Sequence, residues 1–498
     1  MVRVRIPPSP TGLLHIGTAR TALYNFLFAK AKKGVMVYRS EDTDKERSKK
    51  EYEENITSGL KKLGIIGDEG LHCGGPHGPY RMSERGEIYQ KYLEELIQKN
   101  KAYFCFCAKE RLEKMREEQT AKKLPTRYDG TCSTSDPKKS QERIKKGESA
   151  VVRLRVPKDQ DVRWNDLVRG EVVIHSRELD DFVIARKLGD PLYNLAVMVD
   201  DHLMEITHVI RGEDHISNTP KQILLYRAFG WPLPEFAHLP LILNPDKTKL
   251  SKRKNKVSVD DYLGEGFLPE GLINYLALLG WTPPSGKEIL SLEEMIAEFS
   301  LEKVHKGGAI FDMKRLEWIN GEYIRKAIAE DVDAFYDRLM AWSHSDPEAS
   351  GEESPSNPLT QDPILIKKLL RDPDFEGRFK KLSEIPDALK VFFGLPAYDA
   401  SILLNEKFKI TPKILKAVLG ATLKTLEKLD WKKGDASQTK NLSDAMTALV
   451  TELNLKNGQV LWPLRAALSG SEKSPNFATL MVYLGKEETL RRLQNALK

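Results

Sequence analysis

Short apolar strands alternate with longer helical patterns over the first hundred residues. Aliphatic and basic residues alternate at 2–6, a proline-rich loop follows at 7–12, and apolar residues at helical spacing begin near residue 16. A second strand-like run at 35–39 leads into an acidic turn and another helical pattern at 51–63. Alternation of this kind predicts an α/β fold with a doubly wound, parallel, Rossmann-type sheet.

The pattern changes at residue 101. The chain becomes rich in cysteine, then basic, and then strand-like at 151–156 and 171–174. The β/α alternation resumes near residue 193, so we interpret the intervening segment as an inserted α+β domain. The first domain is therefore expected to be split.

Helical patterns dominate after residue 262. Leucine-spaced segments continue to residue 497 with no convincing strand, and a polar stretch at 343–361 is expected to be a surface loop or short linker. The predicted boundaries are 1–100 and 193–262 for the split first domain, 101–192 for the insertion, 263–328 for a helical domain, and 329–498 for an all-helical region divided near residue 405.

Composition and charge narrow the class of protein. The chain has 498 residues, 40% hydrophobic and 30% charged, which is enough for several packed cores. No apolar run approaches the roughly 20 residues of a membrane helix, and the N-terminus lacks the apolar core of a secretory signal. We therefore expect a soluble, cytoplasmic protein. The net charge of +6 is compatible with a polyanionic partner but decides nothing alone.

The loop after the first strand ends in His15-Ile16-Gly17-Thr18, where the first helix begins. Free N–H groups and the helix dipole favour an anion at this point, and glycine permits the close approach of a nucleotide. We expect a phosphate here. A lone H-x-G motif is more often only a turn with a helix-capping histidine.

A second motif is strongly basic, with five cations in the eight residues from Lys247 to Lys254. Lysines on a loop can neutralise charge that develops on a triphosphate during in-line displacement. An ordinary solvated basic loop is the more common meaning of such a run.

Together and in this order, the two motifs resemble the HIGH and KMSKS signatures of class I aminoacyl-tRNA synthetases, and they occur here as HIGT and KLSKR. Both departures are typical of the glutamyl branch. Further segments similar to that branch lie at 39–44, 75–85, 199–202, 209–214, 267–270 and 463–468. The resemblance covers nearly the whole chain and indicates a bacterial-type glutamyl-tRNA synthetase. It implies a Rossmann-type catalytic domain and an all-α anticodon-binding region at the C-terminus.

The same resemblance implies the site residues. His15, Lys249 and Lys252 would be catalytic, with the lysines stabilising the pentavalent phosphate. Those expected to bind ATP are Pro10, His15, Gly17, Thr18, Asp214, Ile242, Lys249, Ser251 and Lys252. Those expected to bind glutamate are Arg5, Ser9, Glu41, Tyr193 and Arg211.

This glutamate set fits the ligand, because two carboxylates and an ammonium need fixed cations and an anion. We expect Arg5 and Tyr193 at the side-chain carboxylate, Arg211 at the α-carboxylate, and Glu41 with Ser9 at the ammonium. Alternatively, Arg5 is an exposed strand residue and Glu41 only caps the acidic turn.

The implied reaction has two steps. The α-carboxylate of glutamate attacks the α-phosphate of ATP, with Mg²⁺ bridging phosphates, and the ribose 2′-hydroxyl of tRNA then attacks the adenylate. The expected partners are L-glutamate, ATP and tRNA(Glu), and the expected state is a monomer. The insertion would hold the acceptor end of the tRNA and the C-terminal helices its anticodon, with Arg465 a candidate base contact.

Three of the four cysteines, Cys105, Cys107 and Cys132, have the spacing of the zinc knuckle of some glutamyl enzymes. The fourth ligand there is usually His or Cys, but this chain has Thr134, a poor zinc ligand. Either another residue completes the site or the site is metal-free. Three ordinary cysteines are the alternative.

Two other functions fit parts of the sequence. A nucleotidylyltransferase could use an H-x-G loop, but it leaves Arg211 and the helical third unexplained. In a non-catalytic tRNA-binding paralogue the intact His15, Lys249 and Lys252 would have no purpose. The helical C-terminus argues against a glutaminyl enzyme, whose anticodon region is built from β-barrels, and its presence argues against a shortened paralogue that modifies a tRNA base.

Overall fold

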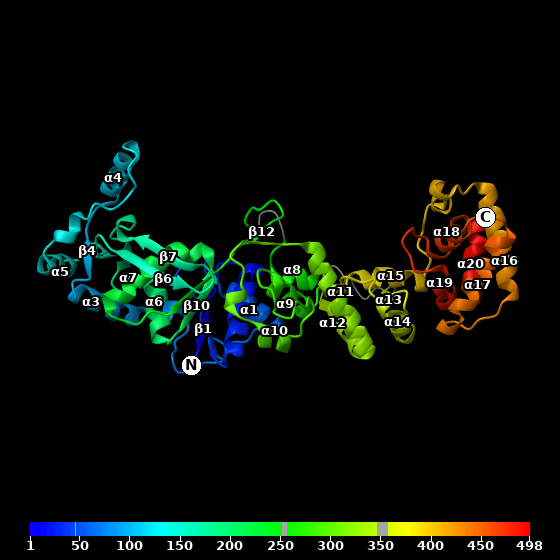
Figure 1. Cartoon of the computed structure of the whole chain (residues 1–498), viewed down its shortest axis with the longest axis horizontal. Coiled ribbons are helices and arrows are strands. Elements are labelled where there is room, and N and C mark those ends of the chain that lie inside the picture. The colour runs from blue at the N-terminus through cyan, green and yellow to red at the C-terminus, as the bar shows by residue number, and fades with distance from the viewer. Residues whose placement is uncertain (45, 251–255, 346–356) are drawn as a thin grey trace. The chain divides into compact units, whose positions relative to one another are not determined.

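The computed structural model of the chain describes residues 1–44, 46–250, 256–345 and 357–498. The chain divides into two compact units (Figure 1). Unit 1 comprises Met1–Asp261 and Leu272–Asp312, and unit 2 comprises Tyr262–Gly271 and Met313–Lys498. No helix among the described residues is long and apolar enough to cross a membrane.

A parallel sheet forms the centre of unit 1. Its first three strands are β1 (Arg3–Ile6), β2 (Val35–Tyr38) and β3 (Glu69–Gly70), in the order β1-β2-β3. A second parallel pair is formed by β10 (His208–Gly212) and β11 (Glu235–Leu239). β10 lies beside β1, because the Thr207 N–H at its start donates to Arg3 O at 2.9 Å. The predicted doubly wound fold is confirmed.

Helices cover the two faces of this sheet. They are α1 (Ile16–Ala31), α2 (Lys50–Lys62), α3 (Gly86–Gln98), α6 (Tyr193–Leu203) and α7 (Thr219–Phe229). α1 is buried along most of its length, which explains why its sequence is apolar on every side. On α6, the buried Asp200 accepts from Arg85 Nε and from the Tyr89 hydroxyl of α3, each at 2.7 Å, so α3 and α6 are joined by a buried ion pair.

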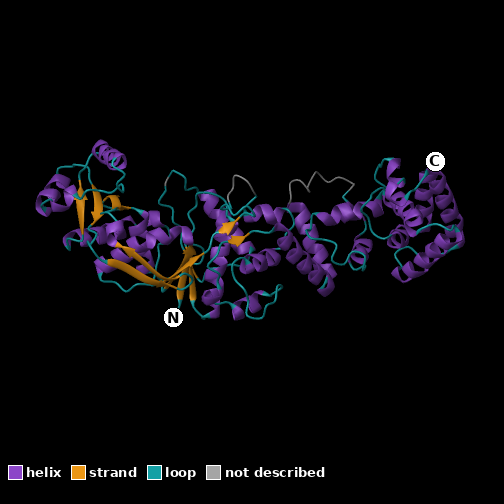
Figure 2. Cartoon of the chain, turned by 45° about the horizontal axis from the view of Figure 1, so that its top comes forward, coloured by secondary structure: helices purple, strands orange, loops and turns teal. Residues whose placement is uncertain are grey.

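The inserted segment contains its own antiparallel sheet. Its strands are β4 (Ala102–Cys105), β5 (Val151–Leu154), β8 (Val183–Lys187) and β9 (Asp190–Pro191), and its helices are α4 (Lys109–Ala121) and α5 (Pro137–Lys145). The hairpin of β6 (Asp161–Asp166) and β7 (Gly170–His175) belongs elsewhere. β6 pairs with β11, with Asp166 opposite Phe236, so the hairpin extends the parallel sheet (Figure 2).

The rest of unit 1 lies on both sides of the basic loop in the sequence. Its elements are β12 (Ile242–Leu243), α8 (Val259–Gly264), α9 (Pro269–Leu278), α10 (Leu292–Glu298) and β13 (Ala309–Ile310), with α8 and α9 shared between the units. β13 pairs in parallel with β12. This strand was not predicted, because two residues are too few to show an alternating pattern.

Unit 2 is helical throughout its described residues, as predicted (Figure 2). Its helices after residue 312 are α11 (Met313–Glu330), α12 (Val332–Ser345), α13 (Pro358–Gln361), α14 (Pro363–Leu370), α15 (Glu384–Phe393), α16 (Pro412–Lys428), α17 (Thr439–Glu452), α18 (Asn457–Ser469), α19 (Phe477–Leu484) and α20 (Lys486–Leu497). Most of the loop predicted at 343–361 lies outside the described residues, and its described ends are helical.

A charged contact holds α20 against α18. Glu488 accepts from Arg491 Nε at 2.7 Å and from Arg492 Nε at 2.6 Å, and the buried Arg492 also donates to Leu468 O of α18 at 2.6 Å. The hydrogen bonds from Arg491, and then those from Arg492, lower the pKa of Glu488 to about 2. Because an ordinary glutamate has a pKa of about 4.3, folding favours the ionised carboxylate.

We therefore predict that Glu488→Gln destabilises the protein at neutral pH. A depressed pKa contributes stability above the unfolded pKa and loses it as the pH falls toward the folded pKa. The difference in melting temperature between wild type and variant should shrink between about pH 5 and pH 3. Thermal unfolding followed by circular dichroism measures this, with Glu452→Gln, on the exposed end of α17, as the control. A difference that stays constant with pH contradicts the prediction.

Candidate active site

A cavity of about 610 Å³ lies at the carboxyl ends of β1 and β10. This position, between neighbouring strands of an open parallel sheet, is where doubly wound folds bind ligands, and the volume suits a small molecule. Eleven predicted site residues line it: Arg5, Ser9, His15, Gly17, Thr18, Glu41, Tyr193, Arg211, Asp214, Ile242 and Lys249. Pro10 is buried in the same loop, and Ser251 and Lys252 lie outside the described residues.

His15 caps the first turn of α1. Its Nδ1 accepts from the Gly17 N–H at 2.9 Å, so Nε2 carries the proton of the neutral ring. A Cβ atom at residue 17 would lie 3.1 Å from that Nδ1, and glycine leaves the room that the cap needs. The chain that follows the basic loop returns to this point, because Val257 O accepts from the Ile16 N–H at 2.9 Å. His15 therefore both caps α1 and lines the cavity.

Three ion pairs build the charged wall of the cavity. The Asp201 carboxylate lies 3.2 Å from Arg5 Nε and 2.6 Å from Arg39 Nη1, and Arg39 Nη2 lies 3.3 Å from Glu41. Arg5 is 1% exposed and Glu41 is 6% exposed. Arg5 is therefore not a solvent-facing strand residue, and Glu41 is more than a cap in an acidic turn.

The protonation of these carboxyl groups follows from burial and from the arginines. Burial raises the pKa of Glu41, although Arg39 and Arg5 oppose that rise. Burial would also raise the pKa of Asp201, but the same two cations outweigh it and hold that pKa below its ordinary value. At this end of the cavity the guanidinium groups of Arg5, Arg39 and Arg211 outnumber the carboxyl groups of Glu41 and Asp201. The wall therefore suits an anionic ligand.

Arg211 presents an unused donor. Its Nε donates to His238 Nε2 at 3.1 Å and its Nη2 to the Thr219 hydroxyl at 2.8 Å, whereas its buried Nη1 has no hydrogen-bond partner. Buried donors without a partner are rare and costly. An anionic oxygen of a ligand in the cavity would satisfy this one.

Tyr193 and His215 form a neutral pair on the same wall, with the tyrosine oxygen 3.1 Å from His215 Nδ1. Burial, followed by the Arg211 cation, lowers the pKa of His215 to about 4, and burial raises that of Tyr193 to about 12. If the neutral histidine donates through Nδ1, the Tyr193 hydroxyl proton is available to a ligand oxygen.

At the opposite end of the cavity, Lys249 Nζ lies 3.1 Å from the Asp214 carboxylate, and both side chains are exposed. Glu213 accepts from the Leu241 N–H at 2.7 Å and pairs with Arg169. These contacts fix the segment after β10 against the basic loop. The predicted nucleotide residues and the predicted amino-acid residues therefore line one continuous cavity.

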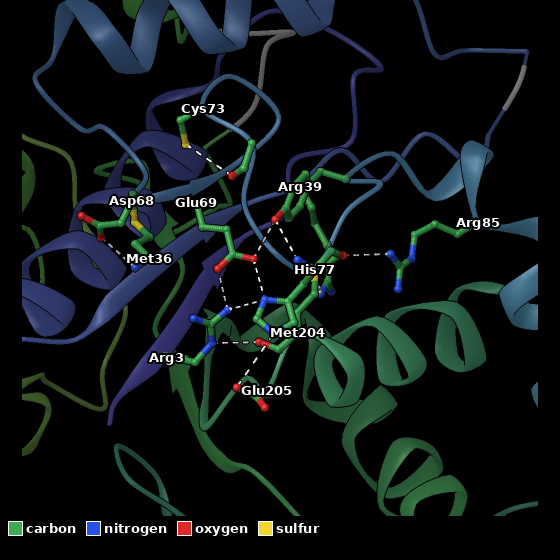
Figure 3. A network of polar contacts seen from close by, with 12 residues as sticks. Arg3, Met36, Arg39, Asp68, Glu69, Cys73, His77, Arg85, Met204 and Glu205 are labelled. Carbon is green, nitrogen blue, oxygen red and sulfur yellow. Dashed lines mark hydrogen bonds and ion pairs between the residues drawn. The ribbon is translucent and has the colours of Figure 1, made fainter.

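A second network surrounds Glu69 on β3 (Figure 3). Its carboxylate accepts from Arg3 Nη2, from the Tyr80 hydroxyl and from His77 Nδ1, each at 2.8 Å. Arg85 donates to Pro79 O at 2.8 Å. The segment at 75–85 is thus held against Glu69 of β3 through His77 and Tyr80. None of its residues lines the cavity.

The three predicted cysteines come together in the insertion. The Sγ atoms of Cys105, Cys107 and Cys132 lie within 4.8 Å of one another, with 3.6 Å between Cys107 and Cys132. Thr134 is exposed, whereas the Tyr128 hydroxyl oxygen lies 3.4 Å from both Cys105 Sγ and Cys107 Sγ.

Comparison with known proteins decides the family. The sequence pattern of the catalytic domain of class I tRNA synthetases (E and Q) matches residues 1–318, and that of an anticodon binding domain matches 334–497. The chain belongs to the class I tRNA synthetases. Glutamate–tRNA ligases from Carboxydothermus hydrogenoformans and from a Sulfurihydrogenibium species are each 42% identical to this synthetase. The matches cover 99% of both chains for the first, and 100% of this chain and 99% of the relative for the second.

A crystal structure is also similar. The glutamate tRNA ligase from Elizabethkingia meningosepticum, in complex with its amino acid, has a TM-score of 0.83 at 34% identity, covering 100% of this chain and 99% of that chain. The family expected from the HIGT and KLSKR motifs is confirmed for this synthetase.

Several residues that hold the site were not among those predicted. Arg39 and Asp201 lie inside segments that resemble the family. For Arg39 the available signal was a charged residue directly after a buried strand, whereas Asp201 lies within α6. His215 follows Asp214 but showed no distinctive spacing. Arg465 of α18, the predicted tRNA contact, is half-buried. It donates to the backbone oxygen of Glu472 at 2.7 Å.

We predict that Asp201→Asn destabilises this synthetase by about 3–5 kcal/mol, because it leaves the buried guanidinium groups of Arg5 and Arg39 without their shared counter-ion. Urea unfolding measures the change. Asp68→Asn is the matched control, since Asp68 pairs with Lys30 at a half-exposed position and should change stability by less than about 1 kcal/mol. Equal effects of the two substitutions would contradict the prediction.

Proposed function

We propose that this synthetase is a glutamate–tRNA ligase, which activates L-glutamate with ATP and transfers it to the 3′ end of tRNA(Glu). The observation that carries the proposal is the excess of cationic groups at the amino-acid end of the cavity, where Arg211 Nη1 has no hydrogen-bond partner. Arg5, Arg39 and Arg211 outnumber Glu41 and Asp201 there, and glutamate carries one net negative charge. Glutamate–tRNA ligases that match over the full chain support the same substrate.

Arg211 is the proposed ligand of the α-carboxylate, because its Nη1 has no partner within the protein. Arg5 and Tyr193 take the side-chain carboxylate, and Glu41 with Ser9 takes the ammonium. A planar guanidinium suits a carboxylate better than a lysine would, since it can donate through two parallel N–H groups.

ATP binds at the first turn of α1, beside His15, Gly17 and Thr18, where the helix N-terminus favours phosphate. Mg²⁺, when bound to the nucleotide, neutralises phosphate charge. Lys249 and Lys252 stabilise the charge that develops as the glutamate carboxylate attacks the α-phosphate. No covalent enzyme intermediate is needed, so positioning and charge carry the catalysis.

The tRNA spans the remaining domains in this proposal. The insertion at 101–192 takes the acceptor end and the helices at 329–498 take the anticodon, with Arg465 as a base contact. Lysines and arginines of these regions contribute salt-dependent affinity for phosphates. A monomeric state and a cytoplasmic location, where ATP and tRNA are available, belong to the same proposal.

We also propose a structural zinc ion at Cys105, Cys107, Cys132 and Tyr128. Ligand atoms about 2.3 Å from one zinc ion lie about 3.8 Å apart in a tetrahedron, close to the 3.4–3.6 Å separations in this cluster. Three thiolates and a phenolate would carry two negative charges in excess of the ion. Two cations offset them. Arg111 Nη1 lies 3.3 Å from Cys107 Sγ, and the Arg153 guanidinium lies 3.8 Å from the Tyr128 ring centre.

The reaction predicts glutamate-dependent exchange of pyrophosphate into ATP, measured with and without tRNA because relatives often need tRNA for activation. Lys249→Ala and Lys252→Ala should each slow the exchange by about 10²- to 10³-fold while tRNA binding persists. Lys247→Asn is the control, since Lys247 lies in the same loop outside the cavity lining. Absence of exchange under both conditions would refute the ligase assignment, and full activity of either alanine variant would remove that lysine from the mechanism.

The zinc proposal predicts about one equivalent of zinc in the protein purified without chelators, measured by mass spectrometry of the metal. Tyr128→Phe and Cys132→Ser should each weaken zinc retention against a chelator, because each removes one ligand. Cys73→Ser, at an exposed cysteine outside the cluster, should retain it. Wild-type protein that is free of zinc, or a Tyr128→Phe variant that holds zinc as tightly as wild type, would count against the site or against Tyr128.

A further inference from the structure

A fully buried hydrogen bond between a histidine and an aspartate lies behind the cavity wall. His238 Nδ1 on β11 is 2.5 Å from Asp166 Oδ2 at the end of β6, and neither side chain is exposed. The other carboxylate oxygen, Asp166 Oδ1, accepts from the backbone N–H groups of Val168, Arg169 and His238 at 3.0–3.1 Å. Four hydrogen bonds therefore hold Asp166 in one orientation.

This arrangement selects one tautomer of His238. Because Asp166 only accepts, His238 must donate through Nδ1, and the neutral ring then accepts at Nε2. Nε2 faces Arg211 Nε at 3.1 Å and the Thr219 hydroxyl at 3.0 Å. Thr219 in turn accepts from Arg211 Nη2 at 2.8 Å. Two donors of the Arg211 guanidinium, Nε and Nη2, are thus held from behind.

We propose that Asp166 and His238 are positioning residues for the amino-acid substrate, because they orient Arg211 so that its Nη1 remains free for the α-carboxylate. This inference rests on the proposed function, in which Arg211 binds that carboxylate. Neither residue lines the cavity, so both act only through Arg211.

The hairpin turn supports the site at a second point. Arg169, three residues after Asp166, pairs with Glu213, which follows β10 and precedes Asp214. The end of β6 and the turn after it therefore support the end of β10 at two points, at Arg211 through His238 and at Glu213 through Arg169. Because this hairpin belongs in sequence to the insertion, part of the amino-acid pocket is built by the segment that is proposed to hold the tRNA.

Asp166→Asn separates a positioning role from a merely structural one. An asparagine can keep the three backbone N–H groups on its carbonyl oxygen, which leaves its NH₂ facing His238 Nδ1. The ring must then accept at Nδ1 and carry its proton on Nε2, opposite the Arg211 Nε–H. Two donors face each other, and Arg211 is displaced although the volume and the packing are unchanged.

The experiment measures glutamate-dependent pyrophosphate exchange by the full chain in the presence of tRNA. Asp166→Asn should raise the KM for glutamate on the order of tenfold and leave the KM for ATP within about twofold. His238→Gln, whose side-chain oxygen can still accept from Arg211, should raise the glutamate KM less than His238→Leu does. Asp181→Asn is the control, since Asp181 accepts from the Val156 N–H and the Tyr103 hydroxyl elsewhere in the insertion. It should leave the glutamate KM unchanged.

The outcomes are distinguishable. Wild type without exchange refutes the proposed function, and this inference with it. Active wild type with an unchanged glutamate KM in folded Asp166→Asn, or with parallel rises in the KM for glutamate and ATP, overturns the positioning role alone. If Asp166→Asn does not fold, the comparison of His238→Gln with His238→Leu decides. An equal KM for glutamate in these two variants overturns the proposal.

Discussion

The Asp201 carboxylate joins three segments that are far apart in the sequence. It lies on α6 and pairs with Arg5 of β1 and with Arg39 at the end of β2, at a depth where each charge needs a partner. None of the three side chains can leave without exposing an uncompensated buried charge. Arg39 extends the network to Glu41. The shape of the amino-acid end of the cavity is therefore set by ion pairs, and the surrounding apolar core keeps water from weakening them.

The insertion is part of the catalytic scaffold as well as an addition to it. Its sheet of β4, β5, β8 and β9 is separate, but the hairpin of β6 and β7 continues the parallel sheet through β11. The pairing of β6 with β11 places Asp166 opposite Phe236. This pairing brings the hairpin close to Arg211, and Arg169 of its turn pairs with Glu213. A segment that sequence assigns to one domain therefore supplies structural contacts to the site of another.

Features that repeat along the chain could be predicted from the sequence, and features that depend on distant partners could not. The β/α alternation predicts that the HIGT loop follows a strand and opens a helix, and in the structure this loop lines the cavity. Arg3 and Arg5, however, alternate on the same strand and look equivalent. Only the fold shows that Arg3 pairs with Glu69 outside the cavity and Arg5 with Asp201 at its wall.

The sequence does not predict the contacts of Tyr128 and His238, because these also depend on partners far away in the chain. Tyr128 lies in a loop without strand or helix periodicity, and its approach to Cys105 and Cys107 depends on how that loop folds back on β4. His238 reads as one polar residue in a buried strand. Its partner Asp166 lies 72 positions away in the chain, so no local pattern connects them.

The charge count of the cavity also bears on the choice between glutamate and glutamine. Arg5, Arg39 and Arg211 outnumber Asp201 and Glu41 around the amino-acid end of the cavity, and the proposed glutamate adds one net negative charge there. A glutamine ligand has nearly the same shape but no side-chain charge. Leaving a buried charge without a counter-ion costs more than losing a neutral contact. Electrostatics at this end of the cavity therefore favours glutamate over glutamine.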